Sequence, residues 1–209
     1  MQAVLAAAQG MSLWELAAVL FAIAYLLLAV REQVLCWYCA FISTTIYTAI
    51  FWDVNLLMES ALNVYYMAMA VFGWYEWTHG GRSPTGGQEK ARGIAISTLS
   101  STQHIIIIIS ITVLSLITGY LLGEYSQAAW PYVDSFTTWG SVVTTYLVAR
   151  KYLENWLYWI VIDSVSIPLY VDRGLNLTAL LFVAYTLIAV AGYFSWRSHY
   201  QSRGVLVEA

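Results

Sequence analysis

Long apolar stretches, each separated from the next by a polar link, make up most of the chain. A helix that crosses a bilayer needs about 20 mostly apolar residues, and stretches of suitable length predict seven helices at residues 13–30, 34–51, 55–77, 103–122, 130–149, 155–171 and 176–196. The links at 31–33, 52–54, 150–154 and 172–175 are short enough to be tight hairpins. The pattern therefore predicts an all-α integral membrane protein with seven transmembrane helices.

The same pattern occurs twice in the chain. Residues 29–77 align with residues 148–196 at a constant shift of 119 residues, without a gap. Chance similarity between apolar segments would match Leu with Val, but it would not keep charged, aromatic and glycine residues in one register. The matched pairs are Arg31 with Arg150, Trp37 with Trp156, Asp53 with Asp172, Leu56 with Leu175, Tyr66 with Tyr185, Ala70 with Ala189, Gly73 with Gly192 and Trp77 with Trp196. We infer an internal repeat of three helices, which is a recognised feature of transporter folds.

The repeat divides the chain into four parts. They are a first three-helix repeat at 13–77, a loop and linking helix at 78–126, a second three-helix repeat at 127–197 and a cytoplasmic tail at 198–209. The single linking helix makes the two repeats parallel, as in the sugar transporters called SWEETs, so the predicted arrangement is 3+1+3. The loop at 78–102 carries Gly, Ser and Pro residues and is expected to be a flexible tether.

Basic residues give the expected orientation. With seven spans, eight of the nine Lys and Arg residues fall on one side of the membrane and only Arg173 falls on the other. Positive charge marks the cytoplasmic side, so the N-terminus is predicted outside and the C-terminus in the cytoplasm. No Lys or Arg precedes the first apolar stretch, so a cleaved signal peptide is not expected.

The composition agrees with a membrane location. The chain is 60% hydrophobic and 10% charged, whereas a soluble domain carries about 25% charged residues. The formal net charge of -3 comes without a basic patch, so no nucleic-acid partner is predicted. Cys36 and Cys39 have the CxxC spacing of redox or zinc sites, but no second Cys pair or nearby His completes a site. Helix packing is the favoured role for both, and no metal or cofactor is predicted.

Polar residues inside the predicted helices indicate where a ligand binds. A polar group in hydrocarbon costs several kcal/mol unless it faces a cavity or a partner. Residues three or four positions apart share one helix face, and two such polar faces are expected to line a midplane cavity between the repeats. One face holds Asn155, Trp159, Asp163, Ser166 and Tyr170, and the other holds Glu59, Asn63, Tyr66, Ala70 and Trp74. The repeat counterpart of Asp163 is Thr44, which puts a second polar group at the same depth.

Other readings of these residues stay open. Asn63 and Asp163 can instead form hydrogen bonds between helices. Trp139 lies near the middle of its helix, where it is either lipid-facing or part of the cavity wall.

Gly73 and Gly192 are interpreted as close helix contacts. Glu154 is expected to form a salt-bridge cluster with its neighbours Arg150 and Lys151. The remaining Trp residues near helix ends are expected to form interfacial belts, with Trp14, Trp52 and Trp130 outside and Trp37, Trp74, Trp77, Trp156 and Trp196 inside.

Three motifs resemble a known family. The strings FGWYEW at 72–77, ARKYLENWLYW at 149–159, and LYVDRGLNLTALL through GYFSW at 169–196 are similar to the PnuC transporters, bacterial inner-membrane carriers of nicotinamide riboside, a form of vitamin B3. The resemblance implies a 3+1+3 fold, passive uptake for NAD biosynthesis, trapping of the riboside by a separate kinase, and a homotrimer in membrane lipid. The family commonly has Asn where this chain has Asp163 and Gln where it has Asn63.

The side chains of the predicted site suit this substrate. Nicotinamide riboside has a flat cationic pyridinium ring, a carboxamide and a ribose. A cationic ring stacked on Trp or Tyr gains about 0.5 to 2 kcal/mol. Asn63 or Asn155 can pair with the carboxamide, and Glu59 or Asp163 can neutralise the ring charge or bind ribose hydroxyls.

Three classes of function are compared. A facilitator for nicotinamide riboside would rock its two repeats around a fixed midplane site. A proton- or sodium-coupled transporter of another nucleoside-like or vitamin solute would use Asp163 or Glu59 to carry the ion. An intramembrane enzyme is the least favoured, because the sequence shows neither a metal cluster nor a nucleophile with a base, and no catalytic residue is predicted.

Overall fold

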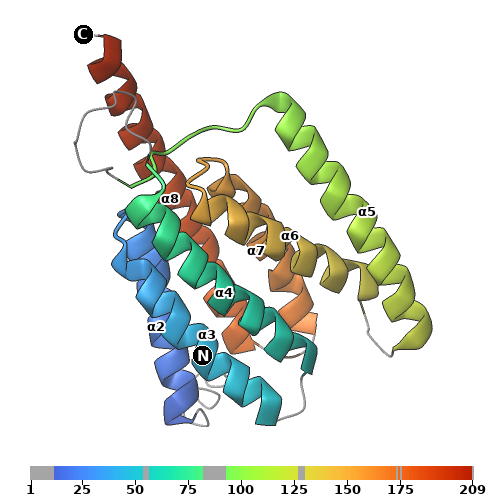
Figure 1. Cartoon of the computed structure of the whole chain (residues 1–209). Helices are drawn as coiled ribbons and strands as arrows, with labels where there is room; N and C mark the ends of the chain where they lie inside the picture. Colours follow the sequence, from blue (N-terminus) through green and yellow to red (C-terminus); the bar gives the residue numbers. More distant parts are fainter. Residues whose placement is uncertain are drawn as a thin grey trace.

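The computed structural model describes residues 12–53, 57–81, 93–126, 130–172, 174 and 176–208. This part of the chain forms seven helices, namely α2 (Leu13–Val30), α3 (Leu35–Asp53), α4 (Leu57–His79), α5 (Ser101–Tyr125), α6 (Pro131–Ala149), α7 (Asn155–Asp172) and α8 (Asn176–Glu208) (Figure 1). The seven predicted helices are therefore confirmed as helices. The main difference is at the C-terminus, where α8 continues past Trp196 and extends beyond the other helices.

Six of the described helices close into a ring, and α5 lies outside it. Around the ring α2 packs on α3, α3 on α4, α4 on α6, α6 on α7, α7 on α8, and α8 on α2. Helix α5 packs mainly on α6, with one contact from His104 to Tyr158 of α7, and stands apart from the ring in Figure 1. The two halves of the chain thus meet along two seams, α4 with α6 and α2 with α8. These seams are equivalent in the repeat, because α2 corresponds to α6 and α4 to α8.

The links that follow α2 and α6 have the same backbone conformation. Glu32 has φ 54° and its repeat counterpart Lys151 has φ 52°. One residue further, the N–H of Gln33 donates to the C=O of Leu28 at 3.0 Å. The N–H of Tyr152 makes the equivalent bond to Leu147, also at 3.0 Å. The internal repeat seen in the sequence is therefore present in the local structure.

Four of the described helices are long and apolar enough to cross a membrane, judged by length and composition. They are α2, α3, α5 and residues Asn176–Ser202 of α8. Helices α4, α6 and α7 carry more polar side chains, including most of those predicted for the site. The seven helices are observed, whereas seven spans remain a prediction.

The described part of the link between α4 and α5 is held in place, in contrast to the predicted flexible tether. The N–H of Ser97 donates to the C=O of Lys151 at 3.0 Å, and the N–H of Leu153 donates to the C=O of Ser97 at 2.8 Å. Ile96 is buried, with 6% of its surface exposed. Residues 93–100 are ordered because this apolar side chain and these backbone bonds attach them to the link after α6. Three of the six Gly and Pro residues of the loop, Pro84, Gly86 and Gly87, lie outside the described residues.

Four tryptophans form the centre of the largest described core cluster. Trp37, Trp77, Trp156 and Trp196 are each at most 3% exposed. The inner belt predicted for these four residues is therefore wrong, because their rings pack against one another. Of the outer set, Trp14 and Trp52 are exposed as a belt requires.

Gly73 and Gly192 make room for two of these rings. A Cβ at Gly73 would overlap the indole of Trp37, and a Cβ at Gly192 would overlap the indole of Trp156. The prediction of close helix contacts at the two glycines is confirmed.

Candidate functional site

Asp163 is a buried acid on α7. The residue is 4% exposed, and no hydrogen bond or ion pair within the described part of the chain reaches its carboxylate. Its electrostatic neighbours are Tyr66 and Tyr185. Burying a carboxylate away from water is costly unless something compensates its charge. A ligand with a positive charge or with hydroxyl donors would provide that compensation.

Two tyrosines interact electrostatically with Asp163, and a third interacts with both of them. Tyr66 comes from α4 and Tyr185 from α8, and Tyr170 of α7 interacts electrostatically with both. The hydroxyl of Tyr66 also shares a hydrogen bond with the side chain of Ser141 on α6. Each of the three tyrosines keeps some accessible surface. The four helices therefore present an acid and several hydroxyls to one space.

Tyr185 and Ser141 were missed by the sequence analysis. The signal for Tyr185 was available, because it is the repeat counterpart of Tyr66. Ser141 had no such signal: its counterpart is Ala22, which is apolar. A polar residue such as Ser141, whose repeat counterpart is apolar, can be recognised as a site residue only from the packing of the helices.

The hydroxyls of Ser166 and Thr44 bind to their own helices. Ser166 donates to the C=O of Ile162 at 2.9 Å, and Thr44 donates to the C=O of Ala40 at 2.8 Å. Such bonds satisfy a hydroxyl donor in an apolar interior and leave its lone pairs available as acceptors.

Asn63 and Glu59 lie on the first turns of α4. The amide of Asn63 donates to the backbone C=O of Glu59 at 2.9 Å, and Asn63 is half-buried. Glu59 is exposed. The structure gives no contact between either residue and Asp163.

Asn155 and Trp159 share the face of α7 that carries Asp163. Asn155 is fully buried at the start of the helix, where its amide donates to the C=O of Tyr152 at 2.6 Å and its Oδ1 lacks a partner. Trp159 is half-buried against the core cluster, one turn before Asp163. Asn155 lies about 12 Å along the helix axis from Asp163, at a rise of about 1.5 Å per residue.

Trp139 faces α5. Its indole N–H donates to the hydroxyl of Thr118 at 3.1 Å. This side chain therefore contributes to the contact between α5 and α6, and Thr118 of the linking helix supplies the acceptor.

The charged residues at the link after α6 pair differently from the prediction. Arg150 Nη1 lies 2.9 Å from Glu76 Oε2, and Lys151 Nζ lies 3.0 Å from Glu32 Oε2. Glu154 instead accepts the backbone N–H of Leu99 at 3.0 Å. The predicted cluster with Glu154 is wrong because each of the two cations reaches a carboxylate of the first repeat.

Comparison with known proteins gives a consistent result. Residues 12–198 match the family described as nicotinamide mononucleotide transporter. The chain is 25% identical over 196 residues to the nicotinamide riboside transporter PnuC of Escherichia coli K12, which covers 85% of this chain and 82% of that protein. It is 26% identical over 184 residues to the riboflavin/roseoflavin transporter RibM of Streptomyces davaonensis, with coverages of 87% and 84%. The crystal structure of the vitamin B3 transporter PnuC matches with a TM-score of 0.70 at 20% identity, covering 89% of this chain and 81% of that one.

Proposed function

The chain belongs to the PnuC family of bacterial membrane transporters, and from this premise we propose that its substrate is nicotinamide riboside. The observation that carries the proposal is the buried Asp163 carboxylate beside Tyr66 and Tyr185, which both interact with Tyr170. A cationic pyridinium ring would compensate the carboxylate and be attracted to the tyrosine faces, worth about 0.5 to 2 kcal/mol. The protein is a carrier and not an enzyme on this proposal.

The rest of the substrate would contact the remaining predicted residues. Trp159 is one turn from Asp163 and would stack on the ring, while Asn155, with its free Oδ1, or Asn63 would pair with the carboxamide. Ser141, Ser166 and Thr44 would accept or donate hydrogen bonds to the ribose, with Glu59 at the outer entrance. Trp139 is left out of this set, because its N–H is bound to Thr118.

Transport on this proposal is facilitated diffusion by alternating access. The two three-helix units, α2–α4 and α6–α8, would rock against each other along the two seams around the fixed site. A separate kinase would phosphorylate the riboside in the cytoplasm and keep it inside. All seven helices would span the inner membrane in a parallel 3+1+3 arrangement, and the apolar outer face of α5 would contact lipid or a neighbouring subunit of a homotrimer.

An ion-coupled transporter is the second candidate. The observation that favours it is the same carboxylate, since a buried acid without a protein partner can carry a proton or Na⁺ through the membrane. The solute would then be another vitamin or nucleoside-like compound, and the riboflavin transporter RibM shows that relatives carry such solutes.

Calorimetry on the purified protein tests the substrate. Nicotinamide riboside is titrated beside nicotinamide, nicotinamide mononucleotide, thiamine and riboflavin. Binding of the riboside in preference to the other four supports the proposal. If riboflavin or thiamine binds and the riboside does not, the substrate assignment is withdrawn.

Uptake into proteoliposomes separates the two mechanisms. Riboside uptake that continues down its own gradient, with proton and sodium gradients collapsed, supports facilitated diffusion. Uptake that stops under these conditions supports ion coupling.

A further inference from the structure

The hydrogen bonds between the two repeats gather at one end of the ring. This is the end where α2 and α6 finish, and we call it the turn end; it includes the links at residues 31–34 and 150–154. Among the described residues, two hydrogen bonds between the repeats lie away from it: Tyr65 Oη donates to the C=O of Val142 at 2.8 Å, and Tyr66 shares one with Ser141. At the opposite end, the described bond from Trp130 to Asp172 stays within the second repeat.

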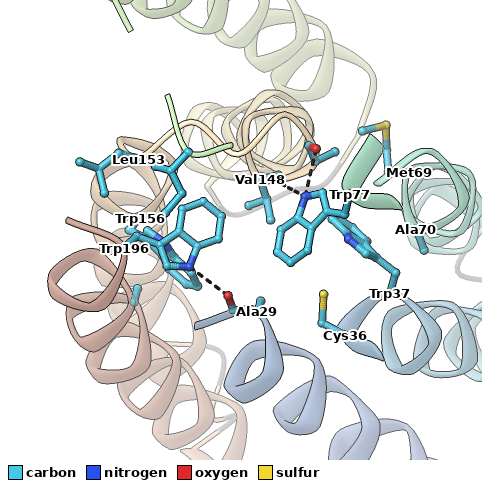
Figure 2. Close-up of a cluster of buried hydrophobic side chains, with 13 residues drawn as sticks. Ala29, Cys36, Trp37, Met69, Ala70, Trp77, Val148, Leu153, Trp156 and Trp196 are labelled. Carbon is cyan, nitrogen blue, oxygen red and sulfur yellow. Dashed lines mark hydrogen bonds between the residues drawn. The ribbon is translucent and has the colours of Figure 1, made fainter. Parts of the chain in front are cut away.

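Two indoles bridge the seams at the turn end in equivalent ways. Trp77 of α4 donates to the C=O of Ala149 at 3.1 Å, and Trp196 of α8 donates to the C=O of Ala29 at 3.0 Å (Figure 2). Trp77 and Trp196 also contact each other, with ring centroids 5.9 Å apart. The two edge-to-face contacts of Trp77 with Trp37 and of Trp196 with Trp156 extend this row into each repeat. The aromatic row therefore closes the space between the repeats at this end.

Ion pairs lie beside the aromatic row. Glu32 accepts from Lys151 Nζ at 3.0 Å and from His199 Nδ1 at 2.7 Å. The side chains of Glu32 and Lys151 are only 11% and 9% exposed. The Lys151 ammonium also lies 4.4 Å from the ring centroid of Trp77. The Glu32 carboxylate therefore binds Lys151 and His199, which both come from the other half of the ring. The Lys151 ammonium also packs on the indole of Trp77.

The backbone turns explain why Glu32 and Lys151 meet. They are repeat counterparts, and both have a positive φ that is uncommon for residues other than glycine. The same turn therefore places an acid, Glu32, in the first repeat opposite a base, Lys151, in the second. Together with Arg31, His199 and Ser202, they line an open depression of about 450 Å³ at the turn end. Water in this depression can solvate both charges once they separate, so the pair can break without leaving a buried charge alone.

We propose that Glu32, Lys151 and His199 form a latch that holds the turn end closed and opens whenever substrate leaves by that end. The inference rests on the proposed function, because it assumes a transport path between the repeats. An ion pair suits this task better than apolar packing alone: it is strong while shielded and is replaced by water when the repeats part. The indole bridges at Trp77 and Trp196 would break in the same step.

The test measures access to the interior from the turn end. Cys36 and Cys39 are replaced by Ala, and Ser141→Cys introduces a reporter beside Tyr66. A membrane-impermeant thiol reagent is applied to one face of sealed vesicles at a time. Glu32→Gln removes the charge that holds Lys151 and His199, so labelling from the turn-end face should become about tenfold faster as the open state gains population.

A matched control and a rescue make the test specific. Glu154→Gln is the same change at the same end, but Glu154 binds Leu99 and does not bridge the repeats; its labelling should stay within about twofold of the parent rate. The exchange Glu32→Lys with Lys151→Glu rebuilds the pair on two turns of equal conformation and should restore slow labelling. If Glu32→Gln does not fold, His199→Asn removes only the outer partner and should speed labelling about threefold.

Two results would overturn the latch. One is that folded Glu32→Gln is labelled at the parent rate. The other is that the exchange of Glu32→Lys with Lys151→Glu is labelled as fast as Glu32→Gln. If Glu32→Gln does not fold, labelling of His199→Asn at the parent rate overturns it as well. The reporter needs no substrate, so these results are independent of the calorimetry. A protein that fails to bind the riboside but shows faster labelling in Glu32→Gln would retain the latch and lose the substrate assignment.

Discussion

At the residue scale, Asp163 determines what kind of solute the site prefers. It is an acid beside Tyr66 and Tyr185, whereas its repeat counterpart Thr44 is not ionisable. Tyr66 and Tyr185 are repeat counterparts, so the site has one symmetric tyrosine pair but is asymmetric in its acid. This asymmetry would orient a cationic ring toward α7 and leave the neutral ribose on the side of α3 and α4.

Asp163→Asn tests this role. The amide keeps the size of the side chain and its hydrogen-bonding capacity but removes the charge, so riboside affinity should fall about tenfold, or about 1.4 kcal/mol. Calorimetry on the purified variant measures the change. Asp172→Asn, at the end of the same helix, is the control and should bind as the parent does. Unchanged affinity in Asp163→Asn would contradict a role of the carboxylate in binding the riboside.

Gly73 and Gly192, which contact tryptophan rings, are two positions where a small substitution should lower stability. Gly73→Ala and Gly192→Ala each place a Cβ where an indole lies, and such overpacking costs about 1 to 3 kcal/mol. Both variants should lower the midpoint of thermal unfolding in detergent. Gly123→Ala is the control, because its Cβ would meet only Pro131, at an ordinary 3.7 Å. Equal midpoints for all three variants would contradict the close packing.

At the element scale, α5 packs against helices of the second repeat. Trp139 binds Thr118, His104 lies 2.8 Å from the hydroxyl of Tyr158, and a Cβ at Gly119 would touch Tyr132. The helix was predicted to link the two repeats and so make them parallel. The contacts of Thr118 and His104 were not predictable from periodicity, since each depends on which side of α5 faces α6 and α7.

A disulfide between α5 and α6 tests whether they move together. A Cβ at Gly119 would lie 3.0 Å from the Cα of Tyr132, which is close enough for Gly119→Cys with Tyr132→Cys to form a bond. If α5 moves with α6, riboside uptake by the oxidised double variant should stay within about twofold of the reduced form. Each single Cys variant is the control. Uptake that stops on oxidation and returns on reduction would show that α5 slides on α6 during transport.

At the scale of the whole molecule, the repeat was the most informative property of the sequence. The shift that pairs Trp77 with Trp196 predicted equivalent helices, and the structure adds equivalent turns at Glu32 and Lys151. Burial of the tryptophans was mispredicted, because hydropathy places an aromatic residue along the helix axis but does not show which neighbour covers it. The partners of Arg150 and Lys151 were missed for a related reason. The partners, Glu76 and Glu32, lie in the other repeat and are far away in sequence.

The distribution of charge over the two ends leads to the last prediction. The links at the turn end carry three basic residues, Arg31, Arg150 and Lys151, whereas the links at the opposite end carry one, Arg173. Basic residues remain on the cytoplasmic side during insertion, so the turn end should face the cytoplasm.

Single cysteines placed at the two ends, in the chain without Cys36 and Cys39, measure this orientation. Ser202→Cys on α8 should react with an impermeant thiol reagent only from the cytoplasmic face, and Ser12→Cys before α2 only from outside. This result would make the latch of Glu32 and Lys151 the gate for release into the cell. The reverse pattern would leave the fold and the site unchanged but make the same latch control entry, so that the riboside would first reach Asp163 through the turn end.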